Sequence, residues 1–150
     1  MRVQIGNERI VIGERALEYY PYYFAIWDDA VDHRLTVKSV LSQWASALAA
    51  LSRFRQGAVY LPYYLDDQTY RFLKAELNEE DVVLTDTLVS ANGYAIDLDD
   101  LSREMYSEPE VVSEGVDWDG RQNDETPKFF GRYSAEEVIE ALKSAEIADA

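Results

Sequence analysis

The chain has no cysteine and only one histidine among its 150 residues. Without cysteine it forms no disulfide and offers no thiolate to catalysis or to a metal ion. A single histidine also argues against a zinc site or a general base built from several imidazoles. That histidine, His33, directly follows Asp32, and we interpret it as a solvent-exposed turn residue.

Familiar catalytic and ligand-binding motifs are missing as well. The sequence contains no glycine-rich phosphate loop, no dinucleotide fingerprint and no Gly-x-Ser-x-Gly elbow. Residues 115–120 partly resemble a calcium loop, but Gly115 and Thr126 stand where carboxylate ligands are needed. Adjacent acids such as Asp28 and Asp29 are interpreted as turn and cap residues. We therefore predict no enzymatic activity, no cofactor and no metal.

Long apolar runs are also lacking. Residues 1–8 do not form the apolar core of a signal peptide, and the longest near-apolar stretch is Trp44–Leu51. A transmembrane helix needs about 20 apolar residues. We therefore expect a soluble, cytoplasmic protein with no membrane partner. A hydrophobic content of 47% argues against disorder, and the length suits one domain over residues 1–150.

What the chain has in excess is acid. Its 29 Asp and Glu outnumber its 14 Lys and Arg, which gives a net charge of -15. The excess is concentrated between Asp97 and Glu125, a segment that contains eleven acidic and two basic residues. Charge of one sign repels nucleic acid and anionic membranes and attracts cationic partners. The other explanation is that the acids serve solubility alone.

Hydrophobic patterning predicts several strands. A hairpin is expected around Gly6-Asn7, because this dipeptide tolerates the positive φ of a two-residue turn. A second hairpin is expected at Asn92-Gly93. The predicted strands are residues 3–5, 9–12, 19–27, 58–65, 81–90 and 94–98.

The clearest helix is predicted over residues 36–54. Val37, Val40, Leu41, Trp44 and Leu48 recur at spacings of three and four, as on the apolar stripe of an amphipathic helix. We expect Thr36 to cap its start and Gly57 to allow its exit.

Three further helices are expected. Ser134, with Glu137 three residues later, forms a capping-box pattern ahead of an apolar stripe. A short helix is predicted after Asp66-Asp67, with Leu73 and Leu77 on one face. Another is predicted over residues 99–106.

Mixed strands and helices with two hairpin signals predict an α+β fold. We expect a single domain with a mainly antiparallel sheet and helices packed on one face. An acidic, loop-rich segment is expected over about residues 107–132, because it holds Pro109, Gly115, Gly120 and Pro127.

Several of these features together resemble the small acidic immunity proteins of bacterial toxin–immunity systems. They are the length, the Gln43-Trp44 pair on an amphipathic helix with Leu48 and Leu51, the strand-rich middle and the acidic aromatic loop. Such proteins cover a basic nuclease or other toxin with an acidic patch. The resemblance therefore implies a non-catalytic binding or inhibitor-type protein with a basic protein partner, and no direct contact with nucleic acid.

The predicted partner surface lies in the acidic segment. Trp118 stands between two Asp residues without periodic apolar neighbours, and it is either a loop anchor or an aromatic contact at an interface. The predicted partner-binding residues are Asp97, Asp99, Asp100, Glu104, Tyr106, Glu108, Glu110, Glu114, Asp117, Trp118 and Asp119.

Two alternatives stay open at the level of sequence. The chain is also interpretable as a small-ligand-binding domain or enzyme in which Tyr60, Tyr63 and Tyr64 line a cleft with acids from separate elements. It is equally interpretable as an adaptor domain whose acidity serves solubility only.

A charge-driven partner surface predicts separable kinetic effects. When a basic partner has been identified, the double variant Asp117→Asn/Asp119→Asn should associate with it more slowly, because carboxylates steer a cationic partner toward the surface. Trp118→Ala should mainly speed dissociation, because it removes buried contact. Surface plasmon resonance at low and high salt measures both rates, and an affinity unchanged by salt contradicts the electrostatic part.

Overall fold

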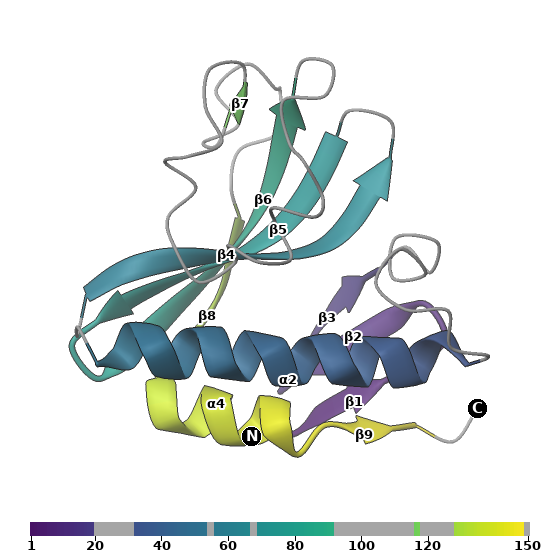
Figure 1. The fold of residues 1–150 in the computed structure, drawn as a ribbon, viewed down its shortest axis with the longest axis horizontal. Coiled ribbons are helices and arrows are strands. Elements are labelled where there is room, and N and C mark those ends of the chain that lie inside the picture. Colours follow the sequence, from purple (N-terminus) through teal and green to yellow (C-terminus); the bar gives the residue numbers. More distant parts are fainter. Residues whose placement is uncertain (20–31, 54–55, 67–68, 92–115, 118–127, 149–150) are drawn as a thin grey trace.

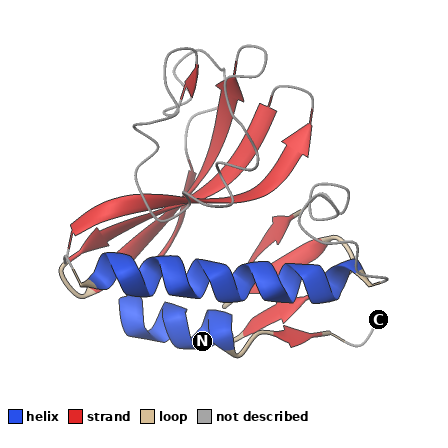
Figure 2. Ribbon diagram, in the orientation of Figure 1, coloured by secondary structure: helices blue, strands red, loops and turns tan. Residues whose placement is uncertain are grey.

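The computed structural model describes residues 1–19, 32–53, 56–66, 69–91, 116–117 and 128–148. They form a small sheet, a large sheet and two helices, shown in Figure 1. Figure 2 shows the two helices side by side below the large sheet. The predicted α+β class with mainly antiparallel strands is confirmed, although the strands form two sheets rather than one.

The small sheet has the order β3-β2-β1-β9. β1 (Val3–Ile5) and β2 (Arg9–Ile12) form the predicted antiparallel hairpin, and β3 (Arg15–Glu18) extends it. The last strand, β9 (Glu146–Ile147), runs parallel to β1 and brings the C-terminal region of the chain beside its first strand.

The first hairpin turn differs in detail from the prediction. The amide of Gly6 donates to the carbonyl of Arg9 at 2.7 Å, so the two turn residues are Asn7 and Glu8 rather than Gly6 and Asn7. Neither Gly6 nor Asn7 has a positive φ. The dipeptide therefore predicted the position of the turn correctly, but the turn does not need the positive φ on which the prediction was based.

The large sheet is a meander of three long strands with two additions. β4 (Gln56–Asp66), β5 (Thr69–Asn78) and β6 (Asp81–Ala91) pair antiparallel in sequence order. β6 then pairs with β8 (Lys128–Ser134) along its first half and with β7 (Val116–Asp117) at its end.

The short helix predicted after Asp66-Asp67 is wrong, because β5 occupies that region. Leu73 and Leu77 are four residues apart, a spacing that keeps two side chains on one face of a strand as well as of a helix. Ala75 lies between them on the same face and is fully buried, which reveals the period of two.

The long helix α2 (His33–Ser52) confirms the strongest helix prediction. Its predicted apolar stripe is buried, with Trp44 and Leu41 both fully enclosed. The predicted ends are wrong: Asp32 rather than Thr36 caps the start, and its carboxylate accepts from the amide of Arg34 at 3.0 Å. Gly57 lies within β4 rather than at the helix exit.

The second helix, α4 (Ala135–Lys143), begins where the capping pattern predicted. The hydroxyl of Ser134 accepts from the amide of Glu137 at 3.1 Å. Val138 and Leu142 are buried against α2 and the rest of the core. Within the described part of the chain, neither helix has both the length and the apolar character needed to cross a membrane.

One continuous core joins both sheets to both helices. Tyr133 of β8 bridges the sheets, because a Cβ built at Gly13 in the β2–β3 turn would lie 3.6 Å from its hydroxyl. Arg15 of β3 adds a second link, since its side chain donates to the carbonyl of Phe129 at 3.4 Å. Its guanidinium also lies 5.6 Å from the centre of the Phe130 ring.

Several predicted elements fall largely or wholly outside the described residues. They are the strand over residues 19–27 after its first residue, the strand over 94–98 with its turn at 92–93, and the helix over 99–106. The loop-rich segment is described at Val116–Asp117, which form β7, and from Lys128 onward, where β8 begins.

The packing of Tyr133 over Gly131 gives a stability test. A Cβ at Gly131 would lie 2.5 Å from Cε2 of Tyr133, so Gly131→Ala must displace that ring. We expect a loss of about 1–3 kcal/mol in the free energy of unfolding, as for other overpacked sites. In a Tyr133→Ser background the same change should cost less, and equal costs in urea unfolding would contradict the contact.

Candidate functional site

The predicted partner surface lies almost wholly outside the described residues. Of its members only Asp117 is described, and its backbone pairs with Ser90 of β6 at the end of the large sheet. The predicted surface therefore stays a prediction. The described residues show a separate gathering of acids at the opposite end of β6.

Charge is unevenly divided between the two parts of the sequence. Outside the described residues lie 14 of the 29 acids but only three of the 14 bases, namely Arg55, Arg103 and Arg121. The described fold therefore holds most of the bases and is much closer to neutral than the whole chain. A local negative field in the described fold therefore depends on where its acidic side chains lie close together.

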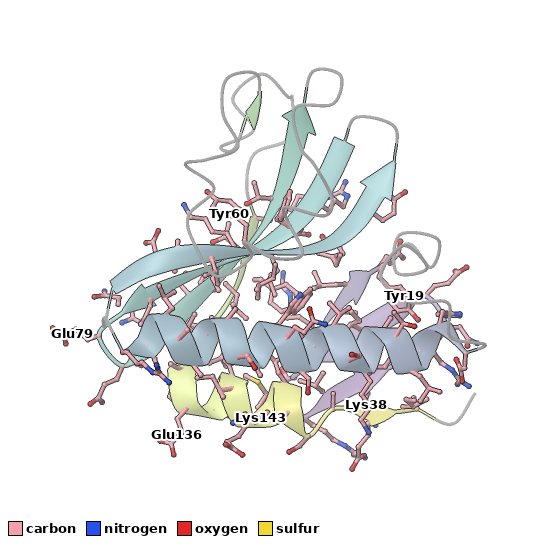
Figure 3. All side chains as sticks on the ribbon, viewed as in Figure 1. Tyr19, Lys38, Tyr60, Glu79, Glu136 and Lys143 are labelled. Atoms are coloured by element: carbon pink, nitrogen blue, oxygen red, sulfur yellow. The ribbon has the colours of Figure 1, made fainter. Side chains whose placement is uncertain are left out.

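Three of those acids, Glu79, Glu80 and Glu136, lie around the turn between β5 and β6. A groove of about 420 Å³ lies between this turn and the start of α4. Figure 3 shows Glu79 and Glu136 at this same end of the molecule. We call it the acidic groove, and its lining residues are Ser52, Glu79, Glu80, Ser134, Ala135, Glu136 and Ile139.

A second hollow of about 260 Å³ shares part of that wall. Glu79 and Glu80 line both hollows, and Asn78, Asp81 and Arg132 complete the second one. The two turn carboxylates therefore border hollows that extend toward both α4 and β8.

The backbone fixes this end of the fold. Asn78 pairs with Asp81, which leaves Glu79 and Glu80 as a two-residue turn. The carbonyl of Glu80 accepts from the amide of Ala135 at 2.8 Å, so the turn is tied to the first residue of α4.

Glu79 has a left-handed backbone, with φ of 58°. Glycine or asparagine adopts this conformation with less strain than glutamate does. A two-residue hairpin turn requires a positive φ at its first residue, so the turn geometry itself accounts for this conformation.

The acids at this end differ in how far they are neutralised. Asp81 is paired with Arg132 at 3.0 Å, and Glu137 lies 3.3 Å from the amino group of Met1. No such pairing involves Glu79, Glu80 or Glu136 within the described residues. These three carboxylates therefore set the negative field of the acidic groove.

Metal binding is not supported by the geometry that is described. Nowhere in residues 1–19, 32–53, 56–66, 69–91, 116–117 and 128–148 do three carboxylate or imidazole side chains gather as a metal ion requires. The acidic groove therefore offers charge over an open surface rather than a coordination shell.

The three tyrosines expected to line a ligand cleft are divided between the faces of the large sheet. Tyr63 and Tyr64 pack with the core, whereas Tyr60 lies on the other face. There Tyr60 meets Phe72 edge to face, with ring centroids 5.9 Å apart. Lys74 lies 5.6 Å from the centre of the Tyr60 ring. The predicted tyrosine cleft is therefore not assembled.

Tyr63 instead forms a buried polar contact. Its hydroxyl donates to the carboxylate of Asp86 across β5, and only 2% of the residue is exposed. Burial, together with the negative charge of Asp86, raises the pKa of Tyr63 far above its ordinary value of 10.0. The contact holds β4 and β6 together on the core face.

His33 is not a free turn residue as expected. It is the first residue of α2, and its Nε2 lies 2.7 Å from the carbonyl of Asn7. The hydroxyl of neighbouring Tyr19 donates to the carbonyl of Gly6 at 2.5 Å. Burial raises the pKa of Tyr19 to about 12. His33 thus fastens the start of α2 to the first hairpin, and the Tyr19 ring lies beside it, with ring centroids 5.9 Å apart.

Comparison with known proteins gives no assignment. No family model matches the chain, and neither a curated protein nor a solved structure matches it.

The sequence analysis missed the acidic groove for an identifiable reason. Asn78 and Asp81 flank Glu79-Glu80 between two apolar segments, and Asn and Asp are residues that favour turns. The mistaken helix before it hid that signal. The approach of Glu136 to the same turn depends on the packing of α4 and has no local sequence signal.

The shifted tyrosines predict how stability changes in alkali. Unfolded tyrosine ionises near its ordinary pKa of 10.0, whereas Tyr19 and Tyr63 ionise at higher pH in the fold. Above pH 10 the folded state therefore keeps more protons bound than the unfolded state does. The contribution of these two tyrosines to the free energy of unfolding is fully present below pH 10 and falls as the pH rises above 10. Tyr63→Phe should make that fall less steep in urea unfolding at increasing pH. An unchanged slope would contradict the assignment.

Proposed function

We propose that this protein is a non-catalytic acidic binding protein, of the inhibitor or immunity type, that covers a basic protein partner. A net charge of -15 favours cationic partners over nucleic acid and anionic membranes. The absence of cysteine suits a cytoplasmic setting.

The observation that carries this proposal is the acidic groove. Glu79, Glu80 and Glu136 line it, and no ion pair neutralises them within the described residues. Glu79 occupies the turn position at which glycine would adopt the positive φ with less strain, so a carboxylate stands in the wall of the groove instead. Carboxylates without a cation beside them in the fold attract a cation of another molecule.

The chemistry of the acidic groove suits a lysine or arginine side chain. Glu79, Glu80 and Glu136 supply the negative charge, and half-buried Ile139 supplies an apolar wall. Long basic side chains bury their aliphatic stems on such surfaces while the charged head meets the carboxylates. A basic partner would bring several such side chains at once.

A small cationic ligand is the second candidate. The volume of about 420 Å³ lies in the range of small-molecule pockets. A polyamine would then bind as tightly as a basic protein surface does, whereas the first candidate requires a multivalent partner.

The experiment compares two variants that have equal net charge. The groove variant replaces Glu79, Glu80 and Glu136 with Gln, and the control replaces the exposed Glu8, Glu14 and Glu18 around the small sheet with Gln. Glutamine at 79 keeps the left-handed strain, so that only charge changes. Binding of an oligo-lysine peptide is measured by calorimetry at low and high salt.

We expect the groove variant to bind about tenfold more weakly, which corresponds to about 1.4 kcal/mol, because three exposed ion pairs are lost. The control should lose much less, and high salt should weaken the wild type. Equal losses in both variants would show that only net charge matters. Loss confined to changes at Asp117 and Asp119 would instead place the surface in the predicted segment.

A further inference from the structure

Strand β8 forms an edge of the large sheet and ends at the acidic groove. β6 pairs with β8 along one side, and among the described strands none pairs with its other side. An edge strand presents backbone N–H and C=O groups, and an extended segment of another protein can bind by pairing with them.

The register of the sheet decides which residues of β8 direct backbone groups to the open side. Asn78 and Asp81 close a two-residue turn and bond to each other, so Val82 directs its backbone groups toward β8. Its partner is Tyr133, which therefore bonds to β6. Bonded and outward positions alternate along an antiparallel strand, so the N–H and C=O of Arg132 point to the open side.

The outward positions of β8 are exposed. Phe129 is 61% exposed, and Arg132 and Ser134 are exposed as well, whereas Gly131, which pairs with β6, is buried. The carbonyl of Phe129 accepts from Arg15 of β3 at 3.4 Å, so pairing with another strand is centred on Arg132. The Phe129 ring offers an apolar contact, since aromatic side chains bury a large area at interfaces.

One end of this edge is acidic. Ser134, the last residue of β8, lines the acidic groove together with Glu79, Glu80 and Glu136. A strand laid along β8 would bring the side chains at one of its ends to these carboxylates. Lysine and arginine suit that end, because they place a cation there and lay an aliphatic stem along the wall of the groove.

The rest of the edge is not acidic in this way. The exposed Arg15 lies beside Phe129, and Arg132 is paired with Asp81 at 3.0 Å. A segment that is basic along its whole length would be repelled near Arg15. The complementary segment therefore carries its bases at one end and apolar residues further along.

We propose that β8 is a docking edge for an extended segment of the basic partner, which pairs with the backbone of Arg132 and carries lysine or arginine at the end that reaches the acidic groove. An apolar side chain of the segment then lies on Phe129, about 16 Å from Ser134 at the rise of an extended strand. This inference rests on the proposed function for the charge of the partner and adds the way in which the partner binds.

The probe is a synthetic peptide with capped ends, in which alternating valine and threonine residues are followed by two lysines. The matched control peptide has the same sequence with an N-methyl group on the amide of every valine and threonine, so it keeps the charge and loses the pairing donors. Calorimetry measures the affinity of each peptide for the full chain. N-methylation should weaken binding about tenfold, because the backbone hydrogen bonds to β8 are lost.

A pair of protein variants tests the same bonds from the other side. Arg132→Pro lacks the outward N–H, whereas the matched control Arg132→Ala loses the same charged side chain and keeps the N–H. Proline is tolerated at such a position, because the N–H that it removes faces the open side of an edge strand. Arg132→Pro should bind the unmethylated peptide about tenfold more weakly than Arg132→Ala does.

The groove variant, with Gln at positions 79, 80 and 136, separates this inference from the proposed function. It should weaken the binding of both peptides. If it does so while N-methylation and Arg132→Pro have no effect, the acidic groove binds cations without strand pairing, and only this inference is overturned. If N-methylation weakens binding and the groove variant does not, the proposed function fails together with the basic end assigned to the segment.

Amide hydrogen exchange at Arg132 identifies what occupies the edge. In the free protein its exchange should be fast at every protein concentration, and the peptide should slow it. Protection that grows with protein concentration would assign the edge to a second copy, and constant protection would assign it to this chain itself; either result overturns the inference. If circular dichroism shows that Arg132→Pro does not fold, the methylated peptide and this exchange experiment still decide, because both use the wild type.

Discussion

The burial of one face of α2 is the constraint on which the rest of this fold depends. α2 contacts α4, β1, β4, β5 and β9, and thus both sheets and the other helix. Trp44, Leu41 and Leu48 lie on that face and are almost fully enclosed. Burying side chains of this size contributes about 1.5–3 kcal/mol each. Tyr133 and Arg15 add smaller contacts between the two sheets.

This burial also determines where charge and polarity are placed. The core face of the large sheet is apolar where it meets the helices, and its buried phenol at Tyr63 is satisfied by Asp86. A buried polar group without a hydrogen-bond partner lowers the free energy of unfolding, and Asp86 spares the buried Tyr63 hydroxyl that cost. The carboxylates of Glu79, Glu80 and Glu136 are left at the end of the molecule, where turn and helix meet.

The large sheet contains two local departures from regular structure. Glu79 has a left-handed φ in the turn beside the acidic groove, a conformation that glycine adopts with less strain. The register of β4 shifts between Pro62 and Tyr64, and the hydroxyl of Tyr63 at this bulge donates to the carboxylate of Asp86.

Local sequence patterns, namely hydrophobic periodicity, turn residues and a capping box, were enough to predict the α+β class, the apolar stripe of α2, the first hairpin, the β4 and β6 strands and the start of α4. These features depend on residues within one or two turns of each other, as in the hydrogen bond between Ser134 and Glu137. The spacing of Leu73 and Leu77 was ambiguous, because four residues return to the same face in both helix and strand.

Only the tertiary structure decided the division into two sheets, the parallel pairing of β9 with β1 and the meeting of Glu79 with Glu136. Each of these joins residues that are far apart in the chain. Such contacts are selected by the packing of all elements around α2, and no local pattern of residues encodes them.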